Sequence, residues 1–240
     1  MASATAGRLI IGDTNSGTHT VNLNSGTVTV KALVFGGGGA NVGGATTVGT
    51  FNLNGGTLVV GDAGQGGVWR YAGYGTYAFN FNGGTIRNSG NQTQTLINTS
   101  KAVTYTIQSG GATFDISGGD VGVGAALGGT GALSKVGNNT LTLTGTSTFT
   151  GGTSVSAGTL ALGHATNTLA NSGGVTVNTN GTLSIGSNSD TVGLVTIAGG
   201  AITGTTGVLT GSGYAGQSGS VSAILGGSGA MTKTTGGTLT

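Results

Sequence analysis

The chain has 240 residues, of which 55 are Gly, and it contains no Pro and no Cys. Gly and Thr weaken helices, so this composition excludes a mainly helical protein, and the absence of Pro excludes collagen. The formal net charge of +2 comes from seven basic and five acidic residues, and because these are scattered we expect no nucleic-acid partner.

One pattern recurs along the first half of the chain: two stretches of alternating apolar and polar residues flank a short turn of Gly or Asn. It occurs at residues 21–30, 51–60 and 79–86, and in a looser form at 105–116. Alternation with period two predicts short strands with one buried face. The turn Gly supplies the positive φ that a tight corner needs.

The same pattern continues in the second half, at residues 155–162, 175–185 and 195–202. The repeat length falls from roughly 30 residues to roughly 20, which lies in or near the range typical of solenoids. Stacking at about 4.8 Å would align the Val, Leu, Ile and Phe side chains inside and leave Thr and Asn outside, where Asn side chains can form ladders. We predict an all-β solenoid of about ten coils. A β-sandwich or barrel is the alternative, but it needs regular hairpins and larger core residues.

A longer repeat divides the chain into two regions. Residues 127–135 recur at 225–233 with three conservative differences in nine positions. We therefore expect a solenoid with longer, irregular coils at 1–126 and a repeat-containing solenoid at 127–240, whose second copy is truncated at the C-terminus. This truncation suggests a piece of a longer repetitive protein.

The longer repeat carries a family resemblance. Residues 128–137, 140–145, 149–153 and 155–160 closely resemble the autotransporter-associated β-strand repeat. The resemblance implies a right-handed parallel β-helix from the passenger of a large exported bacterial protein, secreted or held at the cell surface, with a structural or adhesive role. Residues 1–8 lack the apolar region of a signal peptide, so we expect the export signal outside this segment.

The most unusual segment is 61–77, which holds the single Trp of the chain among several other aromatic residues. It could project as a loop whose aromatic faces bind a glycan or a protein of a host or neighbouring cell, with an Arg for hydrogen bonds or cation–π contact. Alternatively, its aromatic residues cover an apolar edge of the solenoid. The candidate ligand-binding residues are Trp69, Arg70, Tyr71, Tyr74 and Tyr77.

The inventory of reactive side chains argues against catalysis. Glu is absent, and the nearest pair of carboxylates, Asp115 and Asp120, is expected to be solvated. His19 and His164 lie far apart in the sequence, so neither a triad nor a zinc site is expected. We predict no catalytic residue, metal or cofactor, and hence no enzyme. No apolar run approaches the roughly 18 residues of a membrane span.

Two further expectations concern surfaces. Alternating Thr residues at 140–150 could order water and bind ice, but unequal coil lengths should break the required lattice. The terminal coils should expose unpaired backbone groups, which favours self-association through the ends of the rod.

Overall fold

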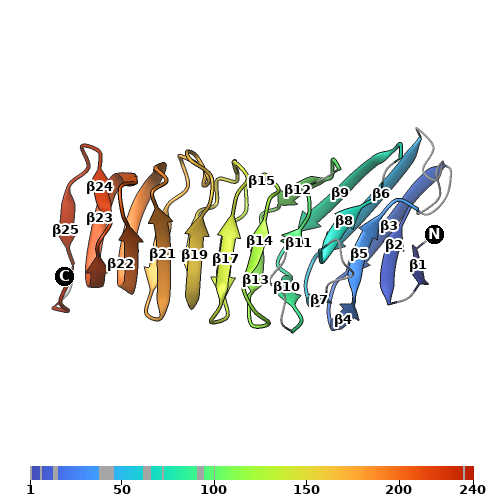
Figure 1. Cartoon of the computed structure of the whole chain (residues 1–240), viewed down its shortest axis with the longest axis horizontal. Coiled ribbons are helices and arrows are strands. Elements are labelled where there is room, and N and C mark those ends of the chain that lie inside the picture. Colours follow the sequence, from blue (N-terminus) through green and yellow to red (C-terminus); the bar gives the residue numbers. More distant parts are fainter. Residues whose placement is uncertain are drawn as a thin grey trace.

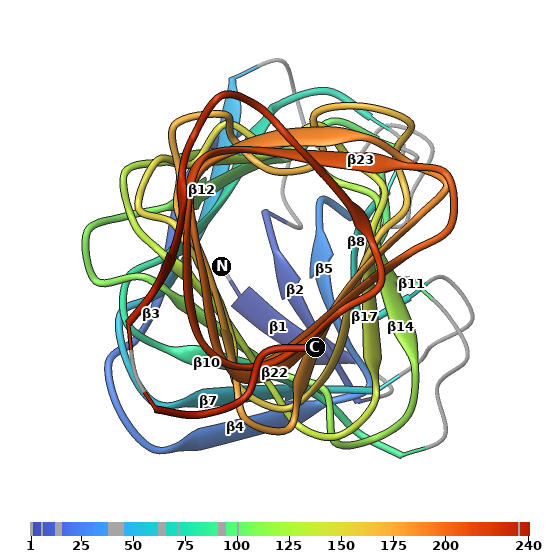
Figure 2. The same cartoon turned by 90° about the vertical axis from the view of Figure 1, so that its left-hand side faces the viewer.

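The computed structural model describes residues 2–5, 7–12, 16–37, 46–61, 66–71, 73–90, 95–99, 101–234 and 236–240. In these residues the regular elements are strands, and they stack into an elongated rod (Figure 1). Seen along the rod, successive coils superimpose around one axis (Figure 2). The prediction of an all-β parallel solenoid is confirmed.

The coils wind around three faces, and neighbouring strands within a face pair in parallel; the coils at 130–189, within the described residues, supply strands to faces 1 and 2 only. Face 1 contains β4 (Thr27–Val30), β7 (Thr57–Val60), β10 (Thr85–Asn88), β13 (Ala112–Asp115), β16 (Leu133–Val136), β18 (Thr153–Val155) and β20 (Val175–Asn178). The middle parts of β22 (Asp190–Gly204) and β23 (Val208–Val221), and then β25 (Met231–Lys233), continue this face.

Face 2 contains β2 (Arg8–Ile11), β5 (Ala32–Phe35), β8 (Val68–Arg70), β11 (Thr95–Ile97), β14 (Val121–Val123), β17 (Thr140–Leu143), β19 (Gly158–Leu162) and β21 (Gly181–Gly186). The later parts of β22 and β23 extend it. The exceptional strand is β1 (Ala2–Thr5), which pairs with β2 in the antiparallel direction and so covers an edge of this face.

Face 3 contains β3 (Gly17–Leu23), β6 (Thr47–Leu53), β9 (Thr76–Phe81), β12 (Thr104–Ile107) and β15 (Leu127–Gly129). Further along the chain, the start of β22 pairs with the start of β23, which in turn pairs with β24 (Ile224–Gly226).

The inward side chains of the three faces form one apolar cluster that extends from Ile11 to Tyr214. On face 3 the ring centroids of Phe51 and Phe79 are 5.0 Å apart, and those of Phe79 and Tyr105 are 6.2 Å apart. A single coil could not bury such side chains alone, so stacking is what creates the core.

Outward Asn side chains form the expected ladder. Asn52 Nδ2 donates to Asn22 Oδ1 at 2.7 Å, and Asn80 Nδ2 donates to Asn52 Oδ1 at 2.8 Å. These residues are 30 and 28 positions apart, yet they remain in register.

On face 1 the register also survives larger differences in coil length, because Thr85 pairs with Thr113 and Ser134 pairs with Ser154 although these pairs are 28 and 20 residues apart. The expectation that unequal coil lengths break the lattice is therefore wrong for the paired strands, whereas residues 144–150 of the expected Thr row do not form a strand.

Candidate functional site

Trp69 lies in β8, in register with Val34 of β5. Its neighbour Val68 belongs to the main core, so the alternation of the strand turns Trp69 to the other side of face 2. There it forms a second apolar cluster with Ile10, Ala32 and Val34 and is only 3% exposed. Trp69 is thus part of a buried patch on the side of face 2 that is turned away from the main core.

Two polar side chains border Trp69. The Arg8 guanidinium carbon lies 5.5 Å from the centroid of the Trp69 ring, and Arg8 Nη1 donates to the Tyr71 hydroxyl at 3.2 Å. The Tyr71 ring meets the Trp69 ring edge-on at 4.5 Å. The buried indole Nε1 has no hydrogen-bond acceptor among the described residues.

Arg70 stabilises the chain that follows β8. Its guanidinium donates to the carbonyls of Ala102 at 2.7 Å and Gly73 at 2.9 Å, and it lies 4.5 Å from the centroid of the Tyr77 ring. The positive charge of Arg70 is therefore bound by groups of the protein itself. Arg70 therefore has a structural role in this arrangement.

Tyr77 points into the main core and is 2% exposed. A Cβ atom at Gly49 would lie 2.6 Å from the Tyr77 ring, so a residue without a side chain is needed there. The Tyr77 hydroxyl donates to the Tyr74 carbonyl at 3.3 Å. Burial raises the pKa of Tyr77, and the charge of Arg70 partly opposes this rise.

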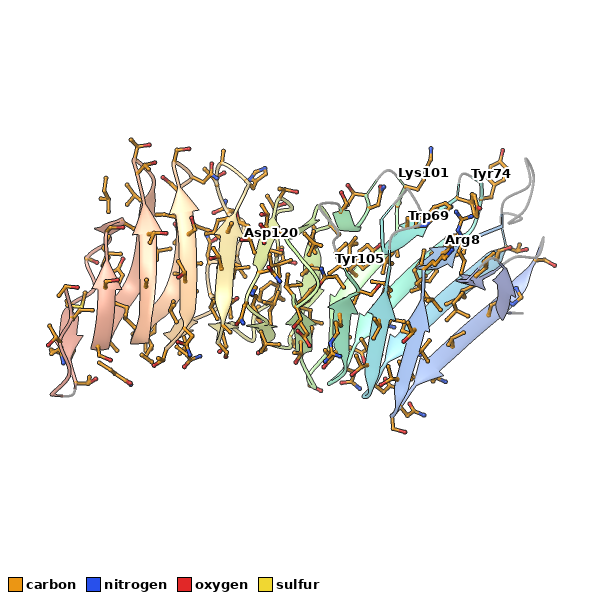
Figure 3. All side chains as sticks on the ribbon, turned by 60° about the horizontal axis from the view of Figure 1, so that its bottom comes forward. Arg8, Trp69, Tyr74, Lys101, Tyr105 and Asp120 are labelled. Atoms are coloured by element: carbon orange, nitrogen blue, oxygen red, sulfur yellow. The ribbon has the colours of Figure 1, made fainter. Side chains whose placement is uncertain are left out.

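The candidate residues therefore do not form one exposed aromatic face. The interpretation of 61–77 as a projecting loop is wrong for Trp69 and Tyr77, which are buried, while residues 62–65 and 72 lie outside the described residues. Tyr74 is 68% exposed. In Figure 3 Tyr74 and Lys101 point outward on the same side of the rod. Ligand binding by this segment stays a prediction, and Tyr74 is its accessible residue.

A second polar centre, which sequence reasoning missed, lies inside the rod at Lys135. This residue is fully buried on face 1, in register between Phe114 and Val155. Its Nζ donates to the carbonyls of Gly137 at 2.6 Å, Ala157 at 2.8 Å and Val136 at 3.2 Å.

Burial lowers the pKa of Lys135 to about 8, and the charges of Asp115 and Asp120 oppose this shift. The period-two pattern of this strand could have indicated that Lys135 is buried, because Lys135 shares the inward side of the strand with Leu133. In the second copy of the repeat, Lys233 Nζ donates to the carbonyl of Gln217 at 2.7 Å.

The described carboxylates serve structural contacts. Asp115 is buried and accepts from Arg87 Nε at 2.7 Å, which corrects the expectation of a solvated Asp115–Asp120 pair. Asp120 accepts from the backbone N–H of Thr140 at 2.7 Å. Asp190 is buried and accepts from the N–H groups of Leu169 and Thr191 at 2.9 and 2.8 Å. Burial raises the pKa of Asp190, whereas its backbone donors lower it.

The described residues offer few other candidate sites. Among the described residues, no three His, Asp, Glu or Cys side chains gather in a way that could hold a metal ion, and Asp13 and Asp62 lie outside them. A shallow hollow of about 320 Å³ is lined by residues that include Gly152, Gly174 and Leu194. The described part of the chain has no helix that could cross a membrane.

The fold defines the class, a parallel β-helix built from stacked three-sided coils. Within it, residues 133–162 match the family model of the passenger-associated-transport-repeat. This match covers β16 to β19, includes Lys135, and confirms the resemblance to an autotransporter passenger repeat over these residues. No curated protein and no solved structure matches the chain.

Proposed function

We propose that this chain is a rigid structural segment of an exported bacterial passenger protein, secreted or displayed at the cell surface. The observation that carries the proposal is the main apolar cluster, which runs without a break through successive coils from Ile11 to Tyr214. The passenger-associated repeat at 133–162 supports the exported context. A rigid rod of this kind would keep the parts of a protein attached to its two ends at a fixed distance from each other.

The proposed role is non-enzymatic and needs no cofactor. The charged groups that are often reactive elsewhere are used here within the fold: Lys135 binds three carbonyls, Asp190 accepts from two N–H groups, and Arg70 holds the chain after β8. These contacts support a stabilising role for the buried polar residues.

Stretching the full chain between two attachment points tests the structural role. Because every coil is hydrogen-bonded to its neighbours, we expect no extension at low force, followed by abrupt unfolding steps. Gradual, spring-like lengthening at low force would show a flexible tether and would contradict the proposal.

Adhesion is a second candidate, favoured by the exposure of Tyr74. If the segment binds a glycan or a protein of a host or neighbouring cell, the purified chain should be retained on a glycan array or on cells. Tyr74→Ala should reduce this retention at least tenfold, while the control Thr205→Ala, at an exposed residue between β22 and β23, should not. Equal retention of all three proteins would count against this surface.

We also propose that copies associate through the coil that contains β24 and β25. Ile224 is 50% exposed and Met231 is 48% exposed, so this coil presents apolar side chains and strand edges together. Sedimentation should show association that depends on concentration and weakens in Met231→Lys. A monomer at all concentrations would contradict this contact.

A further inference from the structure

Face 2 carries two parallel rows of small, mostly hydroxyl-bearing side chains on its outer surface. They lie on β17, β19, β21 and the later parts of β22 and β23, which are side by side in Figure 1. The first row contains Thr140, Thr159, Thr182, Ala201 and Ser220, and the second contains Thr142, Ala161, Ser184 and Thr203. We call these two rows the hydroxyl lattice.

The hydroxyl lattice faces solvent. Its side chains are half-buried or exposed, whereas Leu141, Leu160, Leu183 and Ile202 between them are buried in the core. None of its hydroxyl groups forms a hydrogen bond with another residue in the described part of the chain. They are therefore available as donors and acceptors to whatever covers this surface.

Strand geometry makes this surface periodic in two directions. Neighbouring strands are about 4.8 Å apart, and alternate residues of one strand are about 6.7 Å apart. Parallel pairing in register keeps both spacings constant from β17 to β21. Such two-dimensional repetition matches the surface of a crystal, whose molecules also repeat in two directions, better than it matches a single flexible molecule.

The absence of charged side chains from the two rows further limits the kinds of ligand that this surface can bind. Charged side chains would hold their own hydration shells, but here each position is Thr, Ser or Ala. Hydroxyl groups both donate and accept, as water does, so bridging waters can continue their pattern outward. We propose that the hydroxyl lattice binds ice, an activity independent of the structural role of the rod.

Face 1 provides a natural comparison. It bears a longer single row of hydroxyls in register, which includes Thr85, Thr113 and Thr176. The neighbouring row, which lies two residues further along the same strands, is however charged. It contains Arg87 and Asp115, which form an ion pair. Face 1 is therefore regular in one direction only, and we expect it not to bind ice.

Ice recrystallisation tests the proposal with the full chain. The purified protein should slow the growth of ice grains, and Thr182→Tyr at the centre of the lattice should raise the concentration needed at least tenfold. Thr159→Tyr is a second lattice variant in case the first fails to fold. The matched control is Thr176→Tyr, a half-buried Thr in β20 on face 1. Circular dichroism selects the variants that retain the native spectrum.

Unchanged grain growth with the unmodified chain, relative to an inert protein at equal mass, overturns the proposal. An equal loss in Thr176→Tyr also overturns it, because the effect would then not belong to the hydroxyl lattice. Loss in the lattice variants with full activity in the control supports it.

Discussion

A lysine normally carries a positive charge at neutral pH, and Lys135 brings that charge into the rod. Its three carbonyl partners replace part of the lost hydration, and Ala157 supplies one of them from the next coil. The ammonium group thus links two successive coils within the passenger-associated repeat. The carbonyls do not fully replace the lost hydration of the charged form, and the pKa of Lys135 is lowered for this reason.

This lowered pKa makes the stability dependent on pH. The pKa is about 8 in the folded protein and 10.5 for the ordinary side chain, so between these values the unfolded chain binds more protons. The free energy of unfolding should therefore rise with pH in this window, by up to about 2 kcal/mol between pH 8 and 9.5. Urea unfolding at several pH values measures this slope. In Lys135→Met the slope should be lost, and an unchanged slope would assign it to another group.

Trp69 tests the second apolar cluster. Removing a large buried side chain leaves a cavity, so Trp69→Ala should lower the free energy of unfolding by about 3 to 5 kcal/mol. The exposed Tyr74→Ala should change it by less than about 0.5 kcal/mol. Chemical denaturation of both variants makes the comparison. A small loss for Trp69→Ala would show that the indole is not part of the packed structure.

Tyr105 tests the main core. Its hydroxyl is buried without a hydrogen-bond partner in the described part of the chain, and burial raises its pKa strongly. Because an unsatisfied buried hydroxyl costs free energy, Tyr105→Phe should stabilise the protein by about 1 kcal/mol. A rise in the urea midpoint at constant slope is the expected result. A lower midpoint would mean that the hydroxyl has a partner.

At the scale of elements, the unit of the fold is one coil. Ser154 of β18 is in register with Thr176 of β20, so removing residues 155–176 deletes one complete coil and joins equivalent positions. This variant should still unfold cooperatively, with a native-like circular dichroism spectrum. Removing only 155–165 puts the following strands out of register and should abolish the cooperative transition. If both deletions fold equally well, the coil is not the structural unit.

The strands that could be predicted from the sequence are those with one buried face and one solvent-exposed face. Residues 51–60 alternate because Phe51 and Leu53 face the core while Asn52 faces solvent. The strand Ala32–Phe35 was not predicted, because all four residues are buried and its apolar run shows no alternation. Its outer side packs against Trp69 of the adjacent coil, a contact between residues far apart in the sequence that local periodicity cannot reveal.

The same limit applies to the candidate site. The aromatic residues at 69–77 are recognisable by composition, but their separation onto opposite sides of strands depends on the register of β8 with β5 and of β9 with β6. Composition alone does not show that Lys135 lies inside the rod. Only its position in the alternating strand indicated that it points inward.

At the scale of the whole molecule, strands from distant parts of the sequence lie in one ladder. On face 1 the ladder runs from Thr27 through Thr57, Thr85, Thr113, Ser134 and Ser154 to Thr176. The insertions between strands change the length of each coil without shifting this row. Rigidity, the proposed spacing role and the hydroxyl lattice all follow from such registration.

Distances between spin labels along this ladder test the central claim most directly, because the chain has no Cys and labels can be placed freely. With about 4.8 Å per strand, labels at Thr57 and Thr176 should lie about 24 Å apart, and labels at Thr27 and Thr176 about 29 Å apart. We predict two narrow distributions that differ by about one strand spacing. Broad distributions, or two distances that do not differ by one strand spacing, would contradict the stacked solenoid.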